Sequence, residues 1–267
     1  LGWNCDPNAG LFTCLFCGNL SNDLLTAAYC SSQDVRAAMR YLVHYADEYG
    51  IDTDNIFLGG LSAGSISTLS VAFMDQAEAD QLLPNAVAAA GPVDSSGNDL
   101  NDEYSIKAMI NDCGAVFDTA VITEEDKIPV ISFHDEFDCI VPYAGGRVLN
   151  CLGCEAFPFV SGSSLIHNRL QELGECSSLN TIPLSIGHCS WPEDNIAELG
   201  SCFLKQVMCG DCSSGTNTNT SASADCALLG EPLAEQEDNC PEDLNNDGVI
   251  NTGDLTQLLS VYGATCN

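Results

Sequence analysis

The chain has 267 residues, 45% of them hydrophobic, which is enough for one sizeable core and a small additional module. Its 7 Lys and Arg against 38 Asp and Glu give a net charge of -31, which disfavours binding to nucleic acid or to anionic membranes. No uncharged apolar run approaches the ~20 residues of a membrane-spanning helix.

The cysteine content indicates an oxidising compartment. The chain has 16 cysteines and only 4 histidines, and CxxC spacing occurs at Cys14/Cys17, Cys151/Cys154 and Cys209/Cys212. Zinc would prefer two such pairs close together, or cysteines with histidines, so disulfides are the better interpretation. We therefore expect a secreted, extracellular protein.

The first elements expected along the chain are a loop and a helix. Residues 1–30 are rich in Cys, Gly and Asn and predict a loop held by disulfides. A helix should start at Ser31 or Ser32, because Ser31 with Asp34 resembles a capping box, and it should end before Gly50. Its apolar side chains recur at helical spacing, at Val35, Ala38, Met39, Leu42, Tyr45 and Ala46.

A strand, a turn and further helices follow. Residues 55–58 predict a short strand that leads through 59–64 into a helix over 65–83. The small apolar residues at 86–91 predict a buried strand, and a helical pattern resumes over 103–118.

In the second half of the chain, expected strands continue to alternate with expected helices. Buried strands are expected at 129–134 and 181–186, and helices at 144–152, 162–173 and 193–208. Short buried strands that alternate with helices are typical of a parallel sheet covered by helices. The fold class expected is therefore α/β.

The segment Gly60-x-Ser62-x-Gly64 predicts a nucleophile on a sharp turn. It follows a strand and precedes a helix, which is the context that such a serine needs. The turn is so tight that both flanking positions are expected to need glycine. The amide of Ala63, at the start of the helix, would face an oxyanion.

His188 is the candidate general base. It lies in the loop after the last strand, and the order serine, acid, histidine leaves room for an acid-bearing strand before it. His44 and His167 fall in expected helices, where a structural role is favoured. The strand at 129–134 ends in three candidate acids, and spacing does not choose among Asp135, Glu136 and Asp138.

These residues resemble secreted α/β-hydrolase esterases, nearest to the polyhydroxybutyrate depolymerase and feruloyl esterase group. The resemblance extends over 30–208, through Gln33–Ala38, Tyr49–Asp52 and Gly60–Gly64. It implies an α/β-hydrolase-type parallel sheet and an ester substrate, polymeric or plant-derived.

The resemblance also implies the roles of the site residues. In that group a strand ends in His, as at His134, and the acid follows four residues later, which maps to Asp138. The catalytic histidine lies in a Gly-His-x-Trp-Pro signature, here Gly187 to Pro192 with one residue extra. The implied triad is Ser62, Asp138 and His188, acting through an acyl-enzyme. If the acid and base loops meet, a Cys139–Cys189 disulfide would clamp them.

Three regions are expected along the chain: a hydrolase domain at 1–212, a linker at 213–224 and a calcium module at 225–267. In the related esterases the first strands and the second oxyanion donor precede the region that matches Leu1, so the hydrolase domain is expected to be N-terminally incomplete. Residues 213–224 are small and uncharged, which is typical of a flexible linker.

The last region predicts structural calcium. Its loop has Gly248 at the sharp bend, and the oxygen ligands expected for calcium are those of Asp243, Asn245, Asp247, Val249 (carbonyl), Asn251 and Asp254. The acid at position 12 and the helix pattern after it resemble a single dockerin repeat, which implies a cohesin-like or self-assembly partner. The alternative to a secreted esterase is a non-catalytic extracellular structural or adhesive protein, derived from a hydrolase and assembled with calcium and disulfides.

Overall fold

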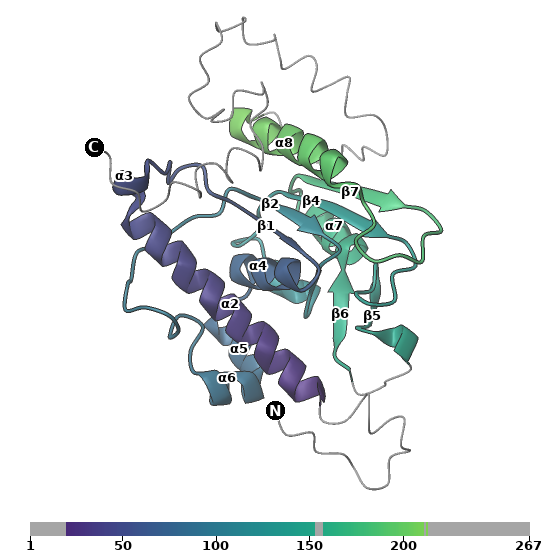
Figure 1. The fold of residues 1–267 in the computed structure, drawn as a ribbon, viewed down its shortest axis with the longest axis horizontal. Helices are drawn as coiled ribbons and strands as arrows, with labels where there is room; N and C mark the ends of the chain where they lie inside the picture. Colours follow the sequence, from purple (N-terminus) through teal and green to yellow (C-terminus); the bar gives the residue numbers. More distant parts are fainter. Residues whose placement is uncertain (1–19, 153–156, 211, 213–267) are drawn as a thin grey trace, which may run out of the picture. The chain divides into compact units, whose positions relative to one another are not determined.

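The computed structural model describes residues 20–152, 157–210 and 212 (Figure 1). The helices of this part are α2 (Leu20–His44), α3 (Ala46–Tyr49), α4 (Ala63–Phe73), α5 (Gln76–Leu82), α6 (Pro84–Ala90), η1 (Thr119–Val121), η2 (Asn150–Leu152), α7 (Ser163–Glu172) and α8 (Glu193–Cys209). The strands are β1 (Phe57–Leu61), β2 (Ala108–Asp112), β3 (Ala115–Val116), β4 (Val130–Asp135), β5 (Gly145–Arg147), β6 (Phe159–Gly162) and β7 (Ser177–Ile182).

Four strands form the central parallel sheet, in the order β1-β2-β4-β7. Helices cover both faces: α4 and α7 pack on one, and α8 lies on the other (Figure 1). Because all four strands run the same way, their carboxyl ends meet at one edge of the sheet, where ligands bind in open α/β folds. The expected α/β-hydrolase-type fold class is confirmed.

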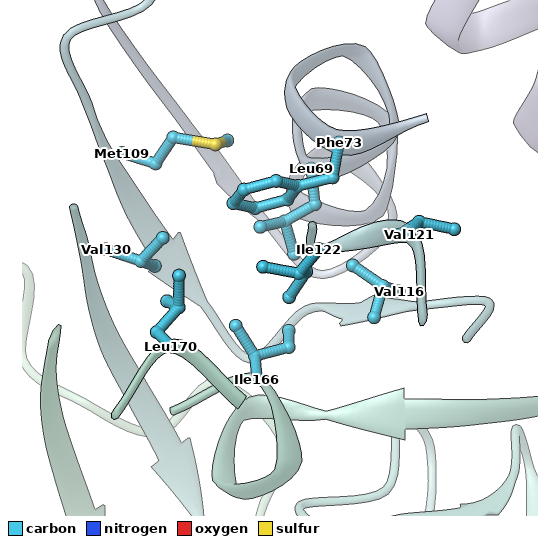
Figure 2. Close-up of a cluster of buried hydrophobic side chains, with 9 residues drawn as sticks. All are labelled: Leu69, Phe73, Met109, Val116, Val121, Ile122, Val130, Ile166 and Leu170. Carbon is cyan, nitrogen blue, oxygen red and sulfur yellow. The ribbon is translucent and has the colours of Figure 1, made fainter. Parts of the chain in front are cut away.

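The main core lies between the sheet and helices α4 and α7. Leu69 and Phe73 reach it from α4, and Ile166 and Leu170 from α7 (Figure 2). They pack on the sheet against Met109 and its neighbours. Full burial of each such side chain stabilises the fold by roughly 1.5–3 kcal/mol. This packing holds α4, and with it the turn that precedes α4, in place above the sheet.

A small antiparallel sheet, in the order β3-β6-β5, lies beside the main one. Its strand β6 ends at Gly162, where an added Cβ would collide with the carbonyl oxygen of Pro142. Only glycine allows that close approach. As a result Ser163, the first residue of α7, comes within hydrogen-bond distance of the His134 ring, with 2.7 Å between Ser163 Oγ and His134 Nδ1.

Helix α2 begins well before the expected start. Residues 20–30, expected as part of a loop, are helical, and Ser31 and Ser32 lie in the helix interior. The Ser32 hydroxyl donates to the carbonyl of Tyr29, and Ser31 Oγ lies 2.7 Å from Ser67 Oγ in α4. The predicted capping box is therefore wrong, because contacts within and between helices satisfy these hydroxyls.

Other expected elements are corrected too. Residues 86–91 are not a strand, since the alanine-rich segment forms α6 with Pro84 at its first position. The helix expected over 103–118 is replaced by β2 and β3, and the one over 144–152 by β5 and η2. The helix expected over 65–83 is divided into α4 and α5 at Asp75, which forms a capping box with Glu78.

Within the described ranges, no helix combines the length and apolar character needed to cross a membrane. The expected linker at 213–224, the calcium module at 225–267 and all six predicted calcium ligands lie outside these ranges.

Candidate active site

Ser62 occupies a sharp turn between β1 and α4. Its backbone has φ 54° and ψ -119°, a region that non-glycine residues seldom adopt. Such a conformation costs on the order of 1–3 kcal/mol and persists only where surrounding contacts hold it. The Ser62 amide donates to the carbonyl of Asp112 (2.8 Å), and its carbonyl accepts from Ile66 in the first turn of α4.

The two glycines that flank this serine are not equivalent. A Cβ on Gly60 would lie 2.5 Å from the carbonyl carbon of Gly64 and from the amide nitrogen of Ser65, so this position requires glycine. A Cβ on Gly64 would have no atom within 4 Å besides its chain neighbours and the nearby backbone of its own helix. The expectation that both positions need a minimal side chain is right for Gly60 and wrong for Gly64.

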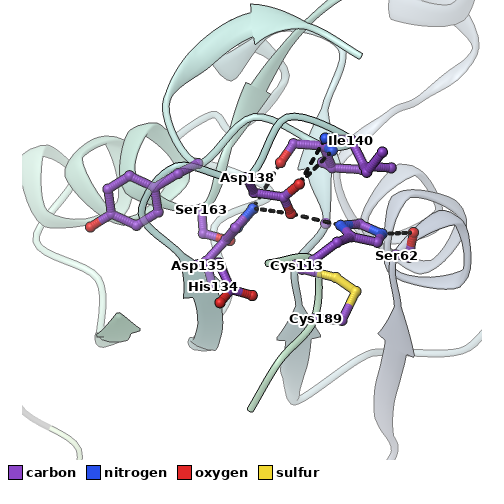
Figure 3. A network of polar contacts seen from close by, with 12 residues as sticks. Ser62, Cys113, His134, Asp135, Asp138, Ile140, Ser163 and Cys189 are labelled. Carbon is purple, nitrogen blue, oxygen red and sulfur yellow. Dashed lines mark hydrogen bonds and ion pairs between the residues drawn. A yellow bond between two sulfur atoms is a disulfide. The ribbon is translucent and has the colours of Figure 1, made fainter. Parts of the chain in front are cut away.

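The structure brings together three side chains that are remote in the sequence. Ser62 Oγ lies 2.8 Å from His188 Nε2, and His188 Nδ1 lies 2.6 Å from Asp138 Oδ2 (Figure 3). They come from the ends of β1, β4 and β7, at the carboxyl edge of the sheet. A hydroxyl, an imidazole and a carboxylate in this order can generate a nucleophilic oxygen.

The tertiary structure selects Asp138 among the three candidate acids. Asp135 Oδ2 instead accepts from the Ser190 amide (2.9 Å), and Glu136 Oε2 accepts from the Leu184 amide (2.7 Å). Only Asp138, among the acids of this segment, directs a carboxylate oxygen at the His188 ring. This is the assignment that the esterase resemblance implies.

Asp138 is held in its ionised form. Burial alone would raise its pKa, but hydrogen bonds from His134, His188 and the Ile140 amide outweigh burial and leave the pKa of Asp138 below its usual value. Its Oδ1 accepts from the amides of Ile140 (2.8 Å) and Val141 (3.2 Å). The second oxygen is thereby aimed at His188.

A buried polar network supports Asp138 from behind. His134 Nε2 lies 3.4 Å from Asp138 Oδ2 and 3.0 Å from the Val141 carbonyl oxygen, and Ser163 contacts the opposite ring nitrogen. Asn111 then donates to Ser163 (2.9 Å). Sequence reasoning left Asn111 and Ser163 out of the site, because neither residue lies in a motif.

The loop that carries His188 is fastened at two further points. The Ser190 amide binds Asp135, and Trp191 packs edge to face on Phe133 with 5.4 Å between ring centroids. These contacts hold the loop on the face of the sheet covered by α8. The loop is therefore held directly after His188, which restrains the position of the imidazole.

The expected Cys139–Cys189 disulfide is wrong. Cys189 is bonded to Cys113, directly after β2, and Cys139 is bonded to Cys151 (Figure 3 shows the first bond). Strand β2 lies between β1 and β4 in the sheet, so the end of β2 is the neighbour of the His188 loop. The bond still restrains the segment next to His188, but it ties that segment to β2 instead of to the acid loop.

Two of the described CxxC cysteines, Cys151 and Cys212, pair outside their own motifs. Cys212 is bonded to Cys176, while Cys209 and Cys30 are the free thiols of the described part. One cluster of potential soft-metal donors occurs there, formed by Cys113, His188 and Cys189. Its two sulfur atoms are joined to each other, which leaves His188 to hydrogen-bond Ser62 and Asp138.

The remaining predicted residues have clear positions. Ala63 is the first residue of α4, where amides have no intrahelical acceptor and can face an anion. His44 contacts Asp102 (3.0 Å), and buried His167 contacts Ser177 (2.9 Å). Burial lowers the pKa of His167. These contacts agree with the structural roles expected for both histidines.

A serine on a strand–turn–helix elbow, with an acid and a histidine after later strands of a parallel sheet, defines an α/β-hydrolase-type domain. Comparison with known families agrees: the BD-FAE family model, a feruloyl esterase and α/β-hydrolase-like domain, matches residues 24–124, a stretch that includes Ser62. No curated protein and no solved structure matches the chain. The family match indicates a hydrolase of esterase type.

Proposed function

We propose that the protein is an extracellular carboxylic-ester hydrolase that uses Ser62, His188 and Asp138 through an acyl-enzyme. The observation that carries this proposal is the continuous series of hydrogen bonds from Ser62 Oγ through His188 to Asp138. The BD-FAE match supports the reaction class. The disulfides at Cys113–Cys189, Cys139–Cys151 and Cys176–Cys212 support an oxidising, extracellular location.

Each group then has one role. Ser62 Oγ attacks the ester carbonyl while His188 Nε2 takes its proton, and the Ala63 amide donates to the oxyanion. The Nδ1–H of His188 donates to Asp138, which keeps Nε2 free to accept. The imidazolium returns the proton to the leaving alcohol. Water, activated by the same imidazole, then hydrolyses the acyl-enzyme.

Covalent labelling tests the nucleophile directly. A fluorophosphonate should form one phosphonyl ester at Ser62 Oγ with loss of fluoride, because His188 makes this hydroxyl nucleophilic. Mass spectrometry of the intact chain and of its peptides measures both the stoichiometry and the site. Hydrolysis of a short-chain p-nitrophenyl ester should fall in proportion to labelling. Label on another serine, or none, would contradict the proposal.

We also propose that the 243–254 loop binds calcium. Its donors are hard oxygen atoms at the spacing that this cation takes. Calcium titration of the full chain by calorimetry should show binding that Asp247→Ala weakens by roughly tenfold or more, since the change removes a charged ligand. Asn246→Ala, at a loop position that supplies no ligand, is the matched control. Equal affinities in both variants would refute the assignment.

A further inference from the structure

Asp112 is a buried carboxylate beside the site that the mechanism above does not use. It is the last residue of β2 and is only 4% exposed. Its Oδ1 is buried and has no hydrogen-bond partner among the described residues. An unpaired buried charge destabilises a fold, so its presence here calls for another explanation.

The backbone places Asp112 between the nucleophile and the base. Its carbonyl oxygen accepts from the Ser62 amide (2.8 Å). The next residue, Cys113, is bonded to Cys189, which directly follows His188. One short covalent path and one backbone hydrogen bond thus connect Asp112 with the segments that carry both reacting side chains.

The register of the sheet gives the direction of its side chain. Asp112 is aligned with Phe133 on the neighbouring parallel strand, and aligned residues point to the same face. Phe133 packs against Trp191 in the His188 loop. The Asp112 carboxylate therefore lies on the face of the sheet that this loop covers.

The charges around Asp112 come from three side chains. Burial raises the pKa of Asp112 to about 6, positive charge on His134 or His188 lowers it, and the charge of Asp135 raises it. Asp112 is therefore ionised at neutral pH and within electrostatic reach of the His188 ring. Asp135 Oδ2 accepts from the Ser190 amide, while Asp135 Oδ1 and Asp112 Oδ1 are both buried without a hydrogen-bond partner among the described residues.

We propose that Asp112 is a positioning residue for His188: a second carboxylate that stabilises the imidazolium formed when Ser62 gives up its proton. The inference rests on the proposed esterase function and deepens it. Asp138 accepts the Nδ1–H bond and sets the orientation of the ring, while Asp112 acts through space on its charge. The two carboxylates share the stabilisation of one cation.

The test is Asp112→Asn in the full chain, because Asn keeps the size of the side chain and removes its charge. At pH 8, kcat/KM for a p-nitrophenyl ester should fall about tenfold, the effect of one pKa unit of lost interaction with the imidazolium. At pH 5 the two proteins should converge, since Asp112 is then largely protonated in the parent. Asp99→Asn, an exposed change in the loop before β2, controls for net charge and should keep the parent profile.

Stability gives a second readout that a purely structural role would not produce. A carboxyl whose pKa is raised by folding stabilises the fold at low pH and loses that contribution as pH rises through about 6. Asp112→Asn should therefore raise the thermal unfolding midpoint at pH 8 and leave it nearly unchanged at pH 4. A packing defect would lower both stability and activity. A variant that is more stable and less active would therefore show that the lost activity comes from the lost charge of Asp112.

Two outcomes would overturn the inference. One is an Asp112→Asn enzyme whose rate is lowered by the same factor at every pH, or is not lowered at all. The other is an Asp138→Asn background in which adding Asp112→Asn costs no further activity. The rise in the unfolding midpoint of Asp112→Asn at pH 8 does not depend on turnover. It therefore distinguishes failure of this inference from failure of the esterase proposal.

Discussion

Replacing Ser62 by Ala is expected to lower the kcat for a short-chain p-nitrophenyl ester by about 10⁶-fold, the usual cost of removing a serine nucleophile. Alanine keeps the Cβ, so the turn at φ 54° and the hydrogen bond from the amide to Asp112 are retained. The loss therefore reports the missing oxygen and not a collapsed elbow. Circular dichroism of the variant should match that of the parent.

Ser201→Ala is the matched control for this substitution. Ser201 is an exposed serine on α8 whose hydroxyl donates to the Glu198 carbonyl oxygen, so its removal should leave turnover unchanged. Turnover by Ser62→Ala at the parent rate would place the chemistry at another residue. A parent protein that hydrolyses no ester at all would favour the structural or adhesive alternative.

Replacing Asp138 by Asn is expected to reduce kcat by about 10⁴-fold. The asparagine amide nitrogen can donate to His188 Nδ1, which favours the tautomer with its proton on Nε2, so the ring can no longer accept from Ser62. The imidazolium also loses the carboxylate that lies 2.6 Å from Nδ1. Single-turnover rates, measured alongside kcat, show whether acylation is the step affected.

The matched control for Asp138→Asn is Glu136→Gln, two residues away. Gln keeps an oxygen that can accept from the Leu184 amide, so this loop should hold and turnover should change little. Similar losses in both variants would mean that the segment is only structurally sensitive.

The pH dependence that Asp138 confers has a defined sign. Its folded pKa lies below the usual value, so Asp138 stabilises the fold above the unfolded pKa, and this contribution disappears as pH falls through the folded pKa. Denaturant unfolding of the parent and of Asp138→Asn should accordingly differ most near neutral pH. The difference should narrow below the ordinary aspartate pKa of 3.8.

Local pattern predicted most of the elements that carry the site, although the strand expected at 181–186 lies four residues earlier, as β7 (Ser177–Ile182). The strand before Ser62, the strand that ends in His134 and the helix at 193–208 correspond to β1, β4 and α8. Each has a clear spacing of apolar residues and ends at residues that favour a turn, such as the glycines at the elbow. Helix α7 was also found, because its apolar side chains recur at helical spacing.

Local pattern failed where neighbours decide the structure. The alanine-rich 86–91 segment is compatible with strand and helix alike, and its packing against Tyr29 and Leu83 accompanies the helix. Ser31 and Ser32 have the chemistry of caps, yet α2 continues through them because its partners satisfy both hydroxyls. Propensity is a weak guide at such positions.

Residue pattern alone predicts the serine elbow, the order of nucleophile, acid and base along the chain, and the α/β alternation that brings them to one edge of a sheet. Spacing leaves three candidate acids open, and the fold places Asp138 against His188, as the esterase resemblance implies. The cysteine that holds the His188 loop, and the buried Asp112 Oδ1 without a partner among the described residues, emerge from the fold alone. These contacts escape pattern reasoning because they join residues far apart along the chain. Ser62 and His188 are 126 residues apart, and the order of the strands sets their separation in space.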